Sequence, residues 1–183
     1  MRTKILKAGI AALLLMIALP AAADFSPRHI VAGESLDLKG TATHRLAGIL
    51  KICRAALYGP ANAAGDSLHL ADIPKRLEIE YYVSVDRDRL IRMAEDSLNT
   101  QFSKAELQPF SREIGEFHKL YRDVGKSDRY AMTYHPDRGL TLELNGEKLG
   151  SVPGALFART YLSIWLGDNP VSPSMKRKLM QQG

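Results

Sequence analysis

The chain has 183 residues, with 25 lysines and arginines against 20 aspartates and glutamates, and a formal charge of +5 at pH 7. Arg2, Lys4 and Lys7 supply three of the basic residues, so the remainder carries only +2. A charge this small gives no support to nucleic-acid binding, which requires a strongly basic face. The length fits one domain with one core.

The first 23 residues have the three parts of a secretory signal peptide. A basic start is followed by an apolar run over 8–19, then by Pro20 and three alanines that end at Ala23. The apolar run is about a dozen residues, whereas a membrane-spanning helix needs roughly 20. We therefore expect cleavage after Ala23, a mature domain of residues 24–183 in the periplasm, and no stable membrane anchor after cleavage.

The sequence contains no motif that compels an enzyme. Cys53 is the only cysteine, so an exported domain would have no internal disulfide. The five histidines lack metal-ligand spacing, and there is no glycine-rich phosphate loop, nucleophile elbow or Cys-x-x-Cys pair. We expect no metal, no cofactor and no catalytic residue.

The first half of the mature chain reads as strands followed by a helix. Residues 24–35 are expected to form a loose N-terminus, and 61–66 a loop of small residues. Alternating apolar and polar residues predict strands, while Asp86 is a helix N-cap. The predicted elements are strands over 36–43, 49–58 and 76–85, a turn over 45–48, and a helix over 87–100.

The second half continues with a helix, a group of strands and two more helices. A capping box at 103–106 precedes a helix that is expected to run to Val124 and stop at Gly125. Strands over 129–135, 140–144 and 148–152 follow, with Asn145-Gly146 as a tight turn. Helices are predicted over 154–166 and from Pro173 to Met180. This order predicts an α+β fold, an antiparallel sheet with helices on one face.

One arginine and four tyrosines are candidates for a ligand site on chemical grounds. Arg45 lies at the bend between two predicted strands, where its planar fork of donors could hold a carboxylate. A solvated turn arginine is the alternative. Hydroxyls for an apolar cleft could come from four tyrosines, although such tyrosines are more often core or sheet-face residues: Tyr58, Tyr81, Tyr82 and Tyr161.

The sequence also resembles the chalcone isomerase-like proteins of bacteria. The resemblance covers roughly residues 36–180, and its most specific parts are Ala55-Ala56-Leu57-Tyr58 and Ile164-Trp165-Leu166-Gly167. It implies a long antiparallel sheet packed by helices, with a cleft between the two layers. In the plant enzymes of this family, an arginine and several hydroxyl groups in the cleft assist an intramolecular ring closure on an enone.

Only the arginine of that catalytic group is retained here. The resemblance places Arg45 at the arginine, Cys53 at a strand threonine, Leu90 at a tyrosine, Ser97 at an asparagine and Ala158 at a helix hydroxyl residue. Non-catalytic relatives hold a fatty-acid carboxylate with the arginine and a tyrosine, and the position of that tyrosine also falls on Cys53. The resemblance therefore argues against isomerase activity without deciding between an enzyme and a non-catalytic member.

Three functions remain open from the sequence. The first is a non-catalytic binder of a small amphipathic acid, such as a fatty acid, in the cleft between sheet and helices. The second is an envelope interaction protein with no ligand. The third is an intramolecular lyase or isomerase acting on an enone-type substrate. We expect the ligand site of the first to include Arg45, Cys53, Tyr58, Tyr81, Leu90, Ser97 and Ala158.

Overall fold

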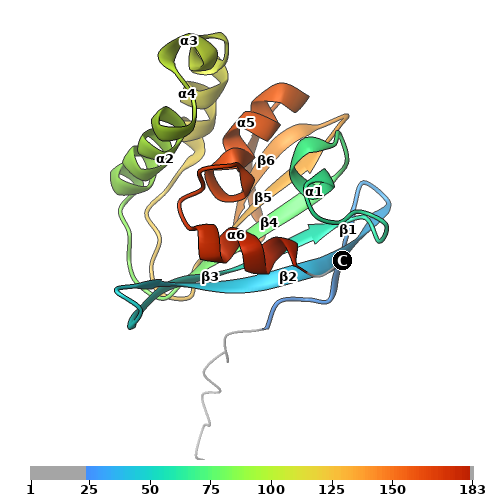
Figure 1. Ribbon diagram of the computed structural model, residues 1–183, viewed down its shortest axis with the longest axis horizontal. Coiled ribbons are helices and arrows are strands. Elements are labelled where there is room, and N and C mark those ends of the chain that lie inside the picture. Colours follow the sequence, from blue (N-terminus) through green and yellow to red (C-terminus); the bar gives the residue numbers. More distant parts are fainter. Residues whose placement is uncertain (1–23, 182–183) are drawn as a thin grey trace, which may run out of the picture.

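Seven antiparallel strands form one sheet in the structure, a computed structural model that describes residues 24–181. The predicted signal peptide, residues 1–23, lies outside this range. Each strand pairs with the next one in the sequence, so the sheet order is the chain order (Figure 1). The strands are β1 (Arg28–Val31), β2 (Glu34–Leu46), β3 (Leu50–Gly59), β4 (Lys75–Tyr81), β5 (Arg129–His135), β6 (Gly139–Leu144) and β7 (Glu147–Val152).

The helices cover one face of this sheet, which confirms the predicted α+β class (Figure 1). The C-terminal helix α6 packs on β2 and β3, while α4 packs on β7 at the far side of the sheet. The helices are α1 (Ser67–Leu70), α2 (Arg87–Gln101), α3 (Lys104–Leu107), the 3-10 helix η1 (Gln108–Phe110), α4 (Ser111–Leu120), α5 (Ala155–Leu166) and α6 (Pro173–Met180).

Several local sequence signals act as expected. Ser103 and Glu106 form the reciprocal capping box at the start of α3. The Ser172 side chain accepts a hydrogen bond from the Met175 N–H at the start of α6. Asn145 and Gly146 have φ of 53° and 84°, the left-handed backbone that a tight hairpin turn requires. These boundaries depend on hydrogen bonds within a few residues, so a local pattern was sufficient to place them.

Three predictions of local structure are wrong, because other segments of the chain pair with these residues. The N-terminal segment is not loose, since β1 pairs with the first residues of β2. The helix expected to reach Val124 ends at Leu120, and the strand expected to reach Val85 ends at Tyr81. Val85 and Val124 instead form a bridge, each N–H donating to the carbonyl of the other at 2.9 and 3.0 Å.

The main core fills the space between the sheet and the helices. Leu77, Ile79 and Tyr81 of β4 point into it, where they meet aromatic side chains of α4 and α5. Phe117 lies 4.7 Å from Tyr161 and 5.8 Å from Phe157 between ring centroids. The buried aromatic residues of this core are Tyr81, Phe117, Tyr121, Tyr130, Tyr134, Phe157 and Tyr161.

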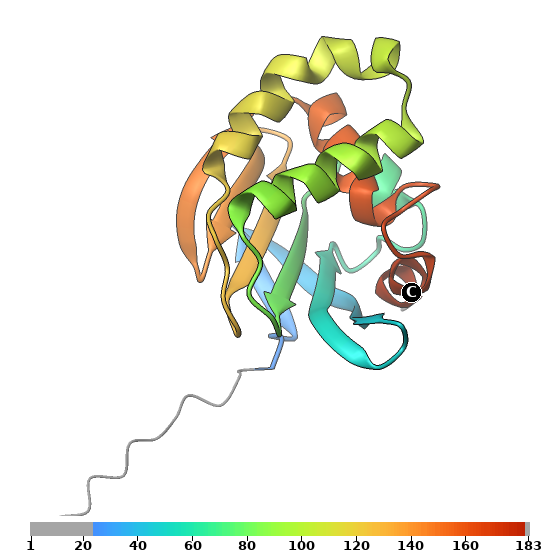
Figure 2. The same cartoon turned by 90° about the vertical axis from the view of Figure 1, so that its left-hand side faces the viewer.

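The opposite face of the sheet is also buried, because the sheet curls (Figure 2). The curl brings β1 over β4, so that His29 Nε2 lies 3.1 Å from Glu78 Oε1 although two strands separate them in the sheet. Glu78 and Glu80 of β4 are only 2% exposed. Arg54 donates to Glu80 at 3.0 Å, and Arg129 contacts both carboxylates. Buried charges of this kind are tolerated only when they are paired.

Candidate functional site

The site begins at the free edge of β2. Strand β1 pairs with β2 only over Glu34–Asp37, and within residues 24–181 no strand pairs with that side of β2 further along. Helix α6 lies against this edge, and its close approach depends on Gly40, where an added Cβ would lie 2.3 Å from the Lys178 carbonyl oxygen. The rest of β2 therefore borders a space between α6 and the N-terminal segment.

That space is a hollow of about 830 Å³, which we call the β2-edge hollow. Volumes of this order are typical of small-molecule sites. It is open to solvent and lies at the margin of the sheet–helix interface. Its lining comprises Asp24 and Phe25, then Leu38, Thr41, Ala42, Thr43, His44, Arg45 and Gly48 of β2 and its turn, Arg54 and Tyr82 behind them, and Ser172, Ser174 and Lys178 beside or within α6.

The hollow has a cationic lining. Arg45 and Lys178 are exposed, and neither makes a hydrogen bond or ion pair within the described part of the chain. The lining contains one acid, Asp24, whose Oδ1 accepts a hydrogen bond from Arg54 Nη1 at 3.1 Å. The lining therefore presents two cations that have no protein partner to an anion in the hollow.

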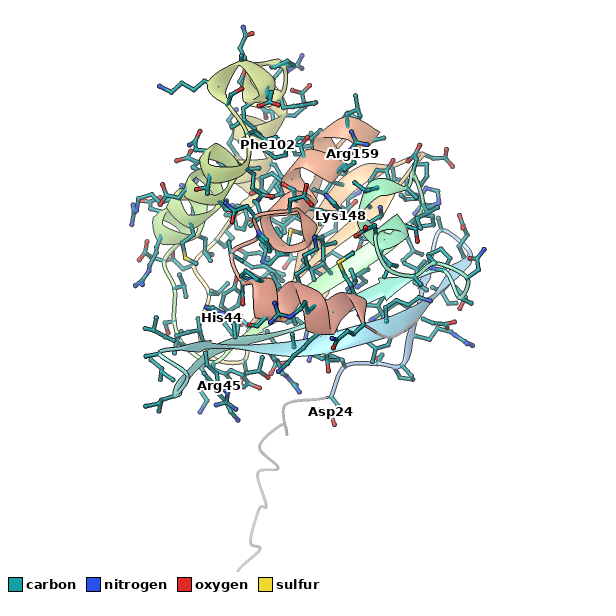
Figure 3. All side chains as sticks on the ribbon, viewed as in Figure 1. Asp24, His44, Arg45, Phe102, Lys148 and Arg159 are labelled. Atoms are coloured by element: carbon teal, nitrogen blue, oxygen red, sulfur yellow. The ribbon has the colours of Figure 1, made fainter. Side chains whose placement is uncertain are left out.

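Arg45 does not point into the space between sheet and helices, where the resemblance would place it. The register of β2 and β3 shifts between His44 and Arg45, but the extra residue, Ile52, belongs to β3, so the alternation of β2 continues through Arg45. His44 follows Ala42 on the helix side and pairs with Cys53, whereas Arg45 extends on the opposite side (Figure 3). His44 was not predicted as a site residue, because the predicted strand ended at Thr43 and a turn was predicted from Arg45, whereas β2 runs to Leu46.

Most of the other predicted site residues lie in the main core, away from Arg45. Tyr81 and Leu90 are buried there, and half-buried Cys53 packs against them from β3. Burial raises the pKa of the Cys53 thiol to about 11. Ser97 is buried in α2, where its Oγ lies 3.4 Å from Gln101 Nε2. Among these residues, none lines the β2-edge hollow.

Tyr58 lies on the opposite face of the sheet. It is fully buried against Leu36 and Ala56, with the His29 ring edge-on at 4.6 Å. Its hydroxyl has no hydrogen-bond partner within residues 24–181, and burial raises the pKa of this hydroxyl. Tyr58 and Tyr81 therefore face opposite sides of the sheet and cannot serve one site.

Ala158 lines a second, smaller hollow between α1 and α5. This hollow has a volume of about 230 Å³ and apolar walls that include Leu70, Leu156 and Leu162. Arg159 of α5 (Figure 3) also lines this hollow, and it is exposed and without a hydrogen bond or ion pair among the described residues. Arg159 and Arg45 are thus both exposed cations that line a hollow, at different places on the surface.

Neither a metal-binding cluster nor a membrane-spanning helix is found in the described part of the chain. Across residues 24–181, histidine, cysteine, aspartate and glutamate do not gather in groups that could hold a metal ion. Among the helices of the same residues, none combines the length and apolar character needed to cross a membrane.

Comparison with known proteins gives a family and a fold. The sequence pattern of the chalcone isomerase-like family matches residues 21–181. A solved structure, the fatty-acid binding protein AtFAP1 of Arabidopsis thaliana, superposes with a TM-score of 0.61 at 17% identity, over 84% of this chain and 95% of that one. The search of curated protein sequences gave no match. Because the family pattern spans the whole domain described above, the chain belongs to the chalcone isomerase-like family.

Proposed function

We propose that this protein binds a small amphipathic carboxylic acid, such as a fatty acid, without converting it. The observation that carries the proposal is Arg45, a guanidinium with no protein partner in the described chain that lines a hollow of about 830 Å³. The similarity in fold to a protein described as fatty-acid binding supports the class of ligand.

The chemistry of the hollow suits a molecule with an anionic end and an apolar body. A carboxylate would receive the paired donors of Arg45, with Lys178 as a second positive charge. Phe25, Leu38 and Ala42 supply apolar surface for the rest of the molecule. Because the hollow is open, the charge contact is weakened by solvent, and apolar contact must contribute much of the affinity.

Replacing Arg45 with alanine tests the anchor. We expect the affinity for a fluorescent fatty acid to fall about fivefold, roughly 1 kcal/mol, because the guanidinium is exposed rather than buried. Affinity is measured by fluorescence titration of the purified protein.

Arg159→Ala is the matched control, because Arg159, like Arg45, is an exposed cation without a partner among the described residues and lines another hollow. It should leave the affinity unchanged. A loss of affinity in Arg159→Ala alone would move the site to the hollow between α1 and α5. Unchanged binding in Arg45→Ala would remove Arg45 from the site.

We also propose that the protein is exported to the periplasm after cleavage behind Ala23. The basic start, the short apolar run and the alanines of residues 1–23 support this. The intact mass of the protein recovered from the cell envelope should correspond to residues 24–183. A mass that includes the first 23 residues would contradict cleavage.

An intramolecular lyase is the second candidate, favoured by the hydroxyl groups of the β2-edge hollow. Thr41, Thr43, Tyr82, Ser172 and Ser174 all line it beside Arg45. Two of them are already engaged, since Ser172 caps α6 and also lies 3.2 Å from the Ser174 hydroxyl. Cyclisation of a chalcone that exceeds the uncatalysed rate and is lost in Arg45→Ala would favour this candidate over the binder.

A further inference from the structure

The turn between β2 and β3 displays an apolar surface that no described residue covers. Leu46 is 60% exposed, Ile49 84% and Leu50 53%. Single exposed apolar residues are common on soluble proteins and require no explanation. Three on one five-residue tip, which projects from the end of the sheet, form a patch of the kind that marks an interaction site (Figure 1, Figure 2).

The tip is held by a tight turn. The Ile49 N–H donates to the Leu46 carbonyl at 3.1 Å, and Ala47 and Gly48 have φ of 49° and 75°. Positive φ at both central residues is the hairpin turn that follows the natural twist of two strands. Leu46 and Leu50 face each other in the strand register, so their side chains are adjacent.

Positive charge lies immediately behind the apolar tip. Arg45 and Lys51 are partners in the register, one pair further from the turn than Leu46 and Leu50, and both are exposed. Lys51 Nζ lies 5.7 Å from the centre of the Tyr82 ring. Between Asp37 and Asp66 the sequence contains no acidic residue. Asp24, the acid in the lining of the adjoining β2-edge hollow, is paired with Arg54.

We propose that this hairpin tip docks on the surface of an anionic lipid membrane. Leu46, Ile49 and Leu50 would enter the boundary between headgroups and acyl chains, while Arg45 and Lys51 contact headgroup phosphates. This combination of a shallow apolar insertion with adjacent cations is how peripheral proteins hold an anionic bilayer. The tip is convex and small, whereas a stable protein–protein interface requires roughly 1,000 Å² or more.

The docking is independent of acid binding but places the β2-edge hollow at the bilayer. Arg45 and Gly48 belong to both the tip region and the lining of the hollow. A protein seated by the tip would therefore present the hollow to the headgroup layer, where free amphipathic acids partition. Because Ile49 and Lys51 do not line the hollow, variants at these positions separate docking from acid binding.

A tryptophan placed at the tip tests the docking at one position. Ile49→Trp is prepared in the protein purified from cells that express the full chain, and its emission is compared with that of the parent, which contains Trp165 alone. With vesicles of phosphatidylcholine and phosphatidylglycerol we expect a blue shift, and quenching by brominated acyl chains. Ile30→Trp is the matched control, because Ile30 is 68% exposed on β1, away from the tip.

Two further variants test the two parts of the contact. Ile49→Ser should weaken vesicle binding about tenfold through lost apolar burial. Lys51→Glu should weaken it at least fivefold and reduce its dependence on salt. Both should keep the parent affinity for a fluorescent fatty acid, so a failure of docking and a failure of acid binding give different results.

Three outcomes would overturn the proposal. The first is no blue shift at position 49 with anionic vesicles, and the second is an equal shift at position 30. The third is a shift at position 49 that depends on protein concentration without vesicles, which would assign the tip to contact with a second copy of the chain.

Discussion

At the scale of single residues, the side of the sheet that a side chain faces decides its chemistry. His44 and Arg45 are neighbours in β2, so the strand alternation turns His44 toward the helix layer and Arg45 toward open solvent. Cys53, opposite His44, becomes a half-buried member of the core margin. Arg45 is therefore accessible to an anion in solution, whereas burial shields the Cys53 thiol from reagents.

The reactivity of Cys53 follows from this position. Burial raises the pKa of the thiol to about 11 from its ordinary value of 9.0, so the thiolate fraction at pH 8 falls about 100-fold. We expect alkylation by iodoacetamide at pH 8 to be at least 100-fold slower than for a peptide thiol, and to become fast in urea. Thiol mass labelling over time measures both rates. Fast labelling of the folded protein would contradict the assigned burial.

At the scale of elements, the β2-edge hollow exists because α6 lies on an edge strand. Gly40 permits this, since its missing side chain leaves room for the carbonyl groups of Lys178 and Leu179. The cap at Ser172 sets where α6 begins. Helix α6 therefore both packs against β2 and supplies one wall of the hollow. A shift of α6 would change the contact with β2 and the shape of the hollow together.

Gly40→Ala should loosen α6 from β2. The new Cβ would lie 2.3 Å from one backbone oxygen and 2.6 Å from another, and backbone atoms cannot rotate away as a side chain can. We expect a loss of about 1–3 kcal/mol in the free energy of unfolding, measured by urea titration.

Gly115→Ala is the control for this change. Gly115 lies inside α4 with no atom within 4 Å of its would-be Cβ, so alanine there should stabilise the protein by up to about 1 kcal/mol. Equal behaviour of the two variants would show that α6 does not depend on the contact at Gly40.

At the scale of the whole molecule, the curled sheet creates two buried layers of opposite character. The face of the sheet that packs on the helices is apolar and aromatic. The opposite face, which lies inside the curl, holds Glu78 and Glu80 among arginines. His118 is buried and His29 and His69 are half-buried, and the pKa of each of the three is lowered, mainly by this burial. The free energy of unfolding therefore depends on pH through these histidines.

Acid should destabilise the fold through His69 and His118. Burial, aided by Lys75 beside His69 and Arg87 beside His118, lowers each pKa to about 4 from 6.5. The unfolded chain then binds more protons than the folded one between pH 6.5 and 4, so stability is complete above pH 6.5 and falls through that window. Each histidine contributes at most about 3 kcal/mol of this loss.

His118→Gln separates one of these contributions. Urea titrations at pH 7 and pH 4.5 should show a smaller fall in the free energy of unfolding for the variant than for the parent. An identical fall in both proteins would show that His118 is protonated in the folded state. The carboxylate of Glu95, 3.6 Å from His118 Nδ1, is the group that would favour such protonation.

Much of the fold was determined by the sequence itself. The alternation of Leu77, Ile79 and Tyr81 predicted a strand and its core face, the Ser103–Glu106 capping box predicted a helix start, and Asn145-Gly146 predicted a hairpin. These features depend on neighbours within about four residues, so a linear pattern contains them. The same patterns predicted the α+β class, and the Ile164–Gly167 and Ala55–Tyr58 segments identified the family.

Only the tertiary structure decided where the candidate site lies. The packing of α6 against Gly40 and the curl that carries His29 over Glu78 each join segments far apart in the chain. The energy of such contacts is a sum over many distant partners, and no local pattern encodes it. For this reason the sequence supplied the cation and the family, whereas the folded chain determined that the cation faces solvent beside an apolar hairpin tip.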